Sequence, residues 1–376
     1  MKSYYKSFCL YGALILVCVL CLYTLTSCKG SDQQQSNKEQ VTFDIKEASN
    51  FVEAYMNSIE KGNFENIKKY YSKKLLQDAF MENKEFKMVG YNIIETSKVG
   101  DTGLFRIRIA RTSTTKPIAS LDEYTVKVAK EGADYKIQET KNSGIKEAFP
   151  EENQIRIKSK QNVNTNLLLD MDSIPNYSFC KDDKANMQKI IVPKKSFGTM
   201  AFSYNGDMLL ITTYDVDSFI AYVKIDEALE VQGGADGGSA GSGGSAGSGG
   251  GTKSSDKSKS NAREKPIGKE LINIDLITDS KIDFLKFSQD EKYIALEYNK
   301  TNIGKSIRIY KTEGGDKIDF KFEEKFPMDK VDVSFSSFDK ENVNFDVTAK
   351  NNSDKSLNEY VGKWQLNLKA LKAKKI

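Results

Sequence analysis

The sequence predicts an α+β domain followed by an all-β domain, both behind an N-terminal export signal. Three observations lead to this fold class. An apolar run without charge covers residues 8–25, helical periodicity gives way to strand alternation between residues 44 and 145, and similar strand–turn–strand segments recur after residue 200. The expected order is therefore signal, tether, a domain of helices and antiparallel strands, and a domain of sheets.

The N-terminus has the three-part layout of a secretory signal. Lys2 and Lys6 precede the apolar run, and the chain becomes polar from Lys29 onwards. The run of 18 residues lies at the lower limit for crossing a bilayer, about 17–25 residues. Its length alone therefore does not separate a cleaved signal from an uncleaved membrane anchor.

The run ends in Leu25-Thr26-Ser27-Cys28, which resembles the cleavage site of bacterial lipoproteins. The resemblance implies that Leu25, Thr26 and Ser27 form the cleavage site, that residues 1–27 are removed, and that Cys28 carries a diacylglyceryl group. Two acyl chains give a stable membrane anchor. The mature chain is then expected at the cell membrane, on its extracytoplasmic face, with membrane lipid as a partner. The alternative is a cysteine buried in a single membrane-spanning helix.

Composition limits the chemistry that the chain can perform. It contains no histidine, which excludes Ser-His-Asp and Cys-His catalysis and zinc sites that need histidine. Carboxylate pairs, tyrosine and lysine stay available, so enzymes are not excluded as a class. We nevertheless expect no catalytic residue, no metal site and no cofactor, and the chain is predicted to be a binding protein and not an enzyme.

Net charge and cysteine content limit the partners that the mature chain can bind and the disulfides that it can form. Removing residues 1–27 deletes two lysines and no acids, and lowers the formal net charge from +4 to +2. This is too little to favour nucleic acid as a partner. Only Cys28 and Cys180 remain in the mature chain, so acylation of Cys28 leaves no intrachain disulfide.

The first domain is placed at residues 44–145, after a polar, flexible tether over residues 28–43. An apolar stripe between residues 51 and 59 predicts an amphipathic helix that ends at Gly62. Two shorter helical segments are expected near residues 64–71 and 75–80. The period then changes to two, which predicts antiparallel strands. These strands are expected over residues 86–94, 104–110, 124–128 and 135–139.

This order resembles the nuclear transport factor two-like (cystatin-like cone) superfamily, over residues 44–143. The resembling segments are residues 51–56, 62–65 and 134–137. The resemblance implies three helices on a curved antiparallel sheet, with a conical pocket for a small ligand or a dimer partner. Some relatives are isomerases with an Asp base and a Tyr donor, for which Asp122, Tyr91 and Tyr124 are the candidates here. The alternative is that these are ordinary core or rim residues.

The second domain is placed at residues 160–371 and contains three similar segments, at residues 200–212, 284–296 and 333–345. Each has an apolar strand, a Phe-Ser pair, an acidic or Asn-Gly turn and a second apolar strand. Phe is expected to fill the core, and Ser to satisfy main-chain groups at the turn. The pattern resembles the blade of TolB-like and WD-repeat β-propellers, over about residues 196–371, and Trp364 is expected to pack in the last blade.

Three blades are fewer than the usual 4–8. Residues 166–192 would supply a further blade, or the domain is an open or irregular propeller. An ordinary β-sandwich is the alternative. Residues 233–265 are rich in Gly, Ser and Lys and predict a disordered insertion within a blade, at an exposed edge.

These features predict a membrane-anchored extracytoplasmic lipoprotein that binds or scaffolds at the cell envelope. Its unknown ligand would be a protein, a peptide or a glycan. One alternative is a hydrolase or isomerase that uses carboxylates in the cone pocket. Another is a sensor or accessory subunit of a membrane protein complex. Two carboxylates converging on a pocket, one with a raised pKa, would favour an enzyme, whereas a shallow polar cleft would favour binding.

Overall fold

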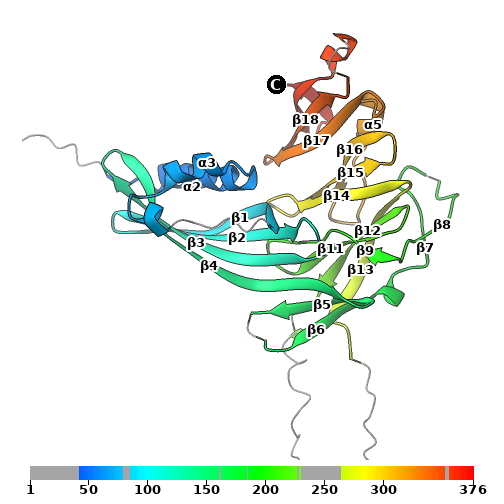
Figure 1. Cartoon of the computed structure of the whole chain (residues 1–376), viewed down its shortest axis with the longest axis horizontal. Coiled ribbons are helices and arrows are strands. Elements are labelled where there is room, and N and C mark those ends of the chain that lie inside the picture. The colour runs from blue at the N-terminus through cyan, green and yellow to red at the C-terminus, as the bar shows by residue number, and fades with distance from the viewer. Residues whose placement is uncertain are drawn as a thin grey trace, which may run out of the picture. The chain divides into compact units, whose positions relative to one another are not determined.

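Antiparallel strands make up most of the chain (Figure 1). The structure, a computed structural model, describes residues 42–78, 85–160, 162–183, 185–226, 228–229, 264–351 and 355–376. The stretch Phe43–Ile376 belongs to one compact unit. The predicted cleavage residues Leu25, Thr26 and Ser27 and the predicted lipidation site Cys28 lie outside the described residues. None of the described helices combines the length and the apolar character needed to cross a membrane.

The first sheet is a six-stranded meander in which each strand pairs antiparallel with the next. The alternation predicted for its second strand is confirmed, since Phe105, Ile107 and Ile109 are buried while Arg106 is partly exposed. The strands are β1 (Phe86–Val99), β2 (Thr102–Ser113), β3 (Ala119–Glu131), β4 (Asp134–Glu151), β5 (Gln154–Ser159) and β6 (Thr165–Asp170).

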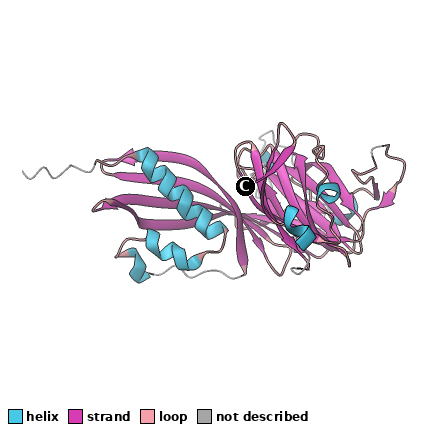
Figure 2. Ribbon diagram, turned by 90° about the horizontal axis from the view of Figure 1, so that it is seen from above, coloured by secondary structure: helices cyan, strands magenta, loops and turns pink. Residues whose placement is uncertain are grey.

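Helix α2 (Ile45–Glu60) lies across one face of this sheet (Figure 2). Asp44 caps its N-terminus by accepting hydrogen bonds from two main-chain N–H groups of the first turn, at 2.7 and 3.3 Å. The predicted apolar stripe is confirmed, because Val52, Tyr55 and Met56 are fully buried. They pack with the inward side chains of β2 and β3 in one core cluster.

The predicted α+β cone domain with three helices is wrong. Among the described residues between α2 and β1, the one further α-helix is α3 (Phe64–Ile67), of four residues, which runs into the 3-10 turn η1 (Lys68–Tyr70). The expected third helix is the 3-10 turn η2 (Leu75–Asp78). Segments this short gain too few hydrogen bonds to form stable helices. The fold is predominantly β, and the sheet continues through β5 and β6 instead of ending as a cone beneath three helices.

Three successive antiparallel sheets follow and form a β-propeller-like arrangement. The strands of the first are β9 (Ser196–Phe197), β10 (Ala201–Phe202), β11 (Met208–Tyr214), β12 (Ser218–Ile225) and β13 (Gly268–Ile277). Those of the second are β14 (Ser280–Phe287), β15 (Tyr293–Lys300) and β16 (Gly304–Lys311). Those of the third are β17 (Val331–Phe338), β18 (Asn342–Ala349), β19 (Gly362–Asn367) and β20 (Lys372–Lys375).

The predicted strand–turn–strand segments are the hairpins β10–β11, β14–β15 and β17–β18. The role expected for serine is confirmed in the first two. Ser203 Oγ accepts from the N–H of Met208 at 3.0 Å, and Ser288 Oγ accepts from the N–H of Tyr293 at 3.0 Å. Each of these hydroxyls also donates to an aspartate of its own turn. The sequence pair therefore fixes the turn through local hydrogen bonds.

Residues 166–192 do not form a blade. Strand β6 pairs with β5 in the first sheet, and β7 (Tyr177–Ser178) pairs with β8 (Ile190–Ile191) as a two-stranded hairpin. The short connecting elements are η3 (Met171–Ser173), α5 (Phe322–Lys325) and η4 (Lys355–Glu359).

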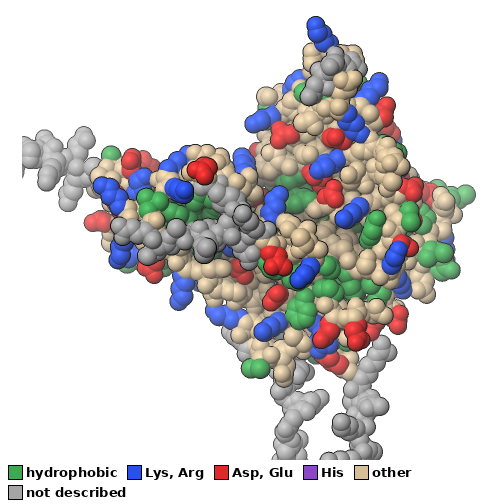
Figure 3. Space-filling model, in the orientation of Figure 1, with side chains coloured by type: hydrophobic (Ala, Val, Ile, Leu, Met, Phe, Trp, Pro, Cys, Tyr) green, Lys and Arg blue, Asp and Glu red, His purple; other side chains and the backbone are tan. Residues whose placement is uncertain are grey.

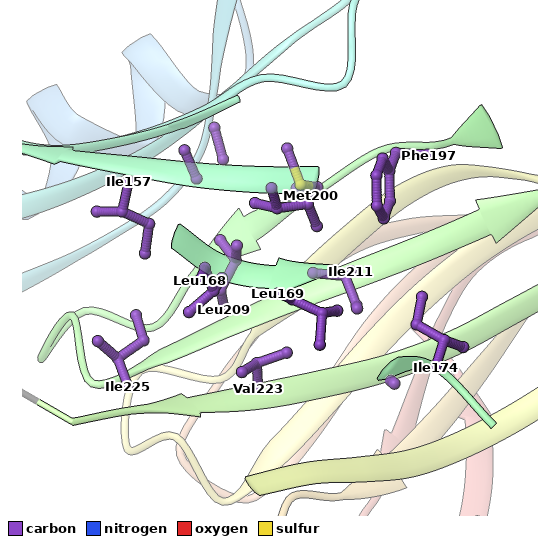
Figure 4. Close-up of a cluster of buried hydrophobic side chains, with 14 of the residues drawn as sticks. Ile157, Leu168, Leu169, Ile174, Phe197, Met200, Leu209, Ile211, Val223 and Ile225 are labelled. Carbon is purple, nitrogen blue, oxygen red and sulfur yellow. The ribbon is translucent and has the colours of Figure 1, made fainter. Parts of the chain in front are cut away.

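The first sheet and the sheet of β9–β13 share a hydrophobic core (Figure 4). Ile155 and Ile157 of β5 and Leu168 of β6 meet Leu209 and Ile211 of β11, and all five side chains are fully buried. Burying a side chain of this size stabilises a fold by about 1.5–3 kcal/mol. The later end of the first sheet is therefore held against the propeller-like part by packing.

Strands β12 and β13 pair side by side, although the chain between them runs from residue 226 to residue 267. The N–H of Asp226 donates to the carbonyl of Ile267 at 2.9 Å, so the two ends of this interval meet. The returning end is also held to the first sheet. Glu264 forms an ion pair with Arg156 at 3.0 Å and accepts from the N–H of Leu167 at 2.9 Å.

Candidate functional site

A cleft of about 870 Å³ lies where the ends of β1 and β2 meet the propeller-like sheets. Its walls come from the ends of β1 and β2, from β9 and β11, from β14 and from β17. In the space-filling view, the surface is hollowed between the helices α2 and α3 and the sheet of β17 and β18, with Lys or Arg side chains along the hollow (Figure 3). A cleft of this size falls within the range of ligand sites, about 300–1,000 Å³.

Three strands that line the cleft each carry a β-bulge there. At the cleft, one register shift in each of β1, β14 and β17 leaves one extra residue in the strand: Val89, Asp283 and Ser336 respectively. All three extra residues line the cleft. A bulge bends its strand and turns a side chain out of the regular alternation, and bulges are common beside functional sites. Three independent bulges therefore converge on one cavity.

The lining is rich in hydroxyl groups and contains one aromatic platform. The rings of Phe284 and Phe335 stack with their centroids 5.5 Å apart and an interplanar angle of 25°. Both side chains are only partly buried. The serine and threonine residues of the lining are Thr112, Ser113, Thr114, Thr115, Ser196, Thr199, Thr212, Ser218, Ser334 and Ser336. Such a surface can hydrogen-bond a polar ligand while the rings contact an apolar group.

Two acidic residues of the lining are neutralised by lysines. Glu60, at the end of α2, forms an ion pair with the buried Lys286 of β14, which ties the helix to the propeller-like part. Glu297 of β15 accepts from Lys305 Nζ at 2.9 Å and, through its other oxygen, from the N–H of Phe335 at 2.9 Å. These carboxylates hold the walls of the cleft together.

Asp283, the extra residue of the β14 bulge, shares the cleft with Glu297. Partial burial raises the pKa of Asp283, and the nearby Glu297 charge adds to the effect, while Lys305 and Lys281 oppose it. Lys305 Nζ therefore donates a hydrogen bond to Glu297, and its positive charge also favours the ionised form of Asp283. The arrangement holds carboxylates beside a cation, as in a structural ion-pair network.

A second cavity, of about 920 Å³, borders a buried charge network around Arg308 of β16. Its guanidinium contacts Asp275 at 2.9 Å, Asp182 at 2.6 Å and Glu323 at 2.9 Å. Asp275 is fully buried and also accepts from Tyr310 Oη at 2.6 Å. We name these five residues the Arg308 network. It joins β13, β16, α5 and the segment after β7.

The charged groups of the Arg308 network change one another's pKa values. Burial alone would raise the pKa of Asp182, but Arg308 and Lys317 outweigh it and lower the pKa to about 2. In Glu323, the effect of burial is likewise outweighed by Arg308, and the pKa is lowered. The carboxylates of Asp182 and Glu323 therefore stay ionised at neutral pH, and their ion pairs with Arg308 link β16 to α5 and to the segment after β7.

The residues expected to act in a cone pocket do not form one acid–base site. Asp122 pairs with Arg111, its Oδ2 lying 3.1 Å from Nε. The hydroxyl of Tyr124 lies 2.9 Å from that of Tyr55, beneath α2. The hydroxyl of Tyr91 donates to Asn57 Oδ1 at 2.9 Å. Burial raises the pKa of all three predicted residues, and each has its own separate partner.

Trp364 packs in the last sheet, as expected. Its ring lies 5.1 Å from that of Phe326, and its indole N–H donates to the carbonyl of Tyr360 at 2.6 Å. The cleft residues were not predicted from the sequence. The available signal was the first strand of the second and third repeats, because β14 and β17 both line the cleft.

No family model matches the chain, and no curated protein matches it either. Solved structures that it resembles include TolB from Acinetobacter baumannii, at 9% identity and a TM-score of 0.23, covering 65% of this chain and 57% of that one. A prolyl endopeptidase matches at 7% identity and a TM-score of 0.24, covering 86% of this chain and 54% of that one. Prolyl oligopeptidase B from Galerina marginata matches at 10% identity and a TM-score of 0.24, covering 81% and 42%. The chain spans between 42% and 57% of the length of these structures, and likeness at this level carries no argument about its function.

Proposed function

We propose that this chain is a lipid-anchored extracytoplasmic lipoprotein that binds a partner at the cell envelope through the cleft. The anchor is inferred from the apolar run and Leu25-Thr26-Ser27-Cys28. The convergence of three bulged strands on one hydroxyl-rich cavity is the observation that carries the binding role.

The anchor is tested by labelling cells with an alkyne-bearing fatty acid and recovering the chain from membranes. The wild-type chain is expected to incorporate the label at the mature N-terminus. Cys28→Ala is expected to lose the label and leave the membrane fraction. An intact N-terminus starting at Met1, or unchanged membrane retention of the Cys28→Ala chain, would overturn this part of the proposal.

Binding is tested by placing a photo-crosslinking amino acid at Lys363 of the cleft, in cells. A discrete adduct is expected there. The same amino acid at Lys158, an exposed position of β5 outside the cleft, is the matched control. If both positions give the same adducts, or neither gives any, the cleft is not a binding site. An adduct with an integral membrane protein would make the chain an accessory subunit of that complex.

A carboxylate-dependent hydrolase or isomerase is the rival function, and Asp283 is the observation that favours it. Its raised pKa and the nearby Glu297 meet part of the pattern expected of an acid–base pair. Against catalysis, both oxygens of Glu297 are engaged by Lys305 and Phe335. If the chain turns over a glycan or peptide library and Asp283→Asn abolishes that turnover, the enzyme is the correct reading.

A further inference from the structure

We infer that the cleft binds an acidic peptide segment in extended conformation, whose main chain runs along the free edge of β14. This inference deepens the proposed binding function and rests on it. It follows from the edge strands, the charges and the aromatic platform of the cleft.

Strand β14 has a free edge that faces away from its sheet. This strand pairs with β15 on one side, and no described strand pairs with its other side. The two ends of that side are capped by side chains. Ser218 Oγ donates to the carbonyl of Ser280 at 2.6 Å, and Tyr204 Oη donates to the carbonyl of Phe287 at 3.1 Å. The stretch from Lys281 to Phe284, between the caps, lines the cleft.

The edge of a strand offers a row of N–H and C=O groups at the spacing of another strand. An extended peptide satisfies such a row, whereas a sugar chain has no matching repeat of donors and acceptors. The bulge at Asp283 bends β14 away from flat pairing, which limits indiscriminate association with other sheet edges. β1 and β17, the other bulged strands of the cleft, are also edge strands of their sheets.

The charged side chains that line the cleft favour an acidic ligand. The side chains of four lysines of the lining make no ion pair or hydrogen bond with the described residues: Lys61, Lys87, Lys281 and Lys363. The lining acids Glu60 and Glu297 are paired with lysines, as described above. Of the two remaining acids, Asp283 interacts electrostatically with Lys281 and Asp346 is the cross-strand partner of Lys363, so these four lysines exceed the two acids by two positive charges. Such a cleft attracts an acidic segment and repels a basic one.

The aromatic platform of the cleft offers a contact for an apolar side chain of the ligand. Phe284 and Phe335 stack across the gap between β14 and β17 and are both partly exposed. In an extended peptide, alternate side chains point to opposite sides. Acidic side chains on one side can therefore meet the lysines while an apolar side chain on the other meets the rings. The favoured ligand alternates acidic and apolar residues.

The test measures binding of fluorescent peptides to the full chain in detergent by fluorescence anisotropy. The first peptide has the length of β14, 8 residues, and alternates Glu or Asp with Val. The second replaces each acid with Lys. The third keeps the acidic sequence but carries a methyl group on alternate main-chain nitrogens, which blocks strand pairing. Only the first is expected to bind, and added salt is expected to weaken it.

Lys281→Glu/Lys363→Glu is expected to weaken binding of the acidic peptide about tenfold or more, because two attractive contacts become repulsive. Lys141→Glu/Lys158→Glu, exposed lysines of β4 and β5 outside the cleft, is the matched control and should bind within about twofold of wild type. Circular dichroism of each variant checks that it is folded.

Equal binding by the cleft and control variants would overturn the inference, as would undiminished binding of the methylated peptide. A third contrary result is binding of an acidic polysaccharide with no binding of the peptide. If adducts form at Lys363 in cells but the peptide does not bind, the binding function stands and the peptide inference fails. If neither occurs, both fail.

Discussion

In the Arg308 network, we expect substitution of Arg308 to lower the free energy of unfolding more than substitution of its buried partner Asp275. Arg308→Met keeps most of the apolar stem and removes the guanidinium. Asp275 is fully buried, and its remaining donors among the described residues would all be neutral, namely Tyr310 Oη and the N–H groups of Lys181 and Leu276. Leaving a buried charge without its partner costs about 3–5 kcal/mol of unfolding free energy.

Asp275→Asn is expected to cost less, about 1–3 kcal/mol, the loss of a hydrogen bond between charged groups. The reason is that Arg308 keeps Asp182 and Glu323, at 2.6 and 2.9 Å. Adding Asp275→Asn to Arg308→Met removes the stranded carboxylate. The double variant is therefore expected to be more stable than Arg308→Met alone, by at least about 1 kcal/mol.

The assay is urea unfolding of the full chain. Trp364 is the sole tryptophan and reports on the last sheet, while far-ultraviolet circular dichroism reports on all the strands. Coincident curves justify the use of a single free energy of unfolding. The reasoning is refuted if Asp275→Asn costs as much as Arg308→Met, or if the two losses simply add in the double variant.

Three further predictions concern pH and backbone geometry. Because the pKa of Asp182 is lowered to about 2, its stabilising effect is present above about pH 4 and is lost as the pH falls towards 2. The difference in urea midpoint between wild type and Asp182→Asn should therefore shrink over that range, and a constant difference would contradict the assignment. Burial raises the pKa of Tyr71 to about 12, so stability is full below about pH 10 and declines between pH 10 and 12 as the unfolded chain ionises first; Tyr71→Phe should flatten that decline in alkaline urea titrations. Gly206 has φ +78°, and a Cβ there would lie 2.8 Å from Leu121 Cδ2, so Gly206→Ala should cost about 2–3 kcal/mol in thermal unfolding. Gly132→Ala, with φ +68° and open space, is the control and should cost about 1 kcal/mol.

Local features of the fold could be predicted from the sequence. The stripe of Val52, Tyr55 and Met56 is buried as its spacing requires, and Ser203 and Ser288 close their turns as expected. These outcomes depend on residues a few positions apart. The cone domain was wrongly predicted because the far end of the first sheet is decided by distant partners, such as Leu209, which shares a core cluster with Ile155.

The cleft could not be predicted for a similar reason. Val89, Asp283 and Ser336 become functional candidates only because each is the unmatched residue in its strand pairing. Register depends on both strands of a pair, which a single segment does not contain. Lys281 and Lys363 look like ordinary solvated lysines until the sheets bring them to one cavity.

The hydrogen bond between Asp226 and Ile267 has a practical consequence. Since the chain departs and comes back at a single point, with Glu264 clamped independently by Arg156, a guest protein whose own termini are adjacent can be spliced in there. A fluorescent guest at this junction would turn the molecule into a biosensor. A change in the number of residues between Leu229 and Glu264 is likewise expected to leave the described sheets undisturbed.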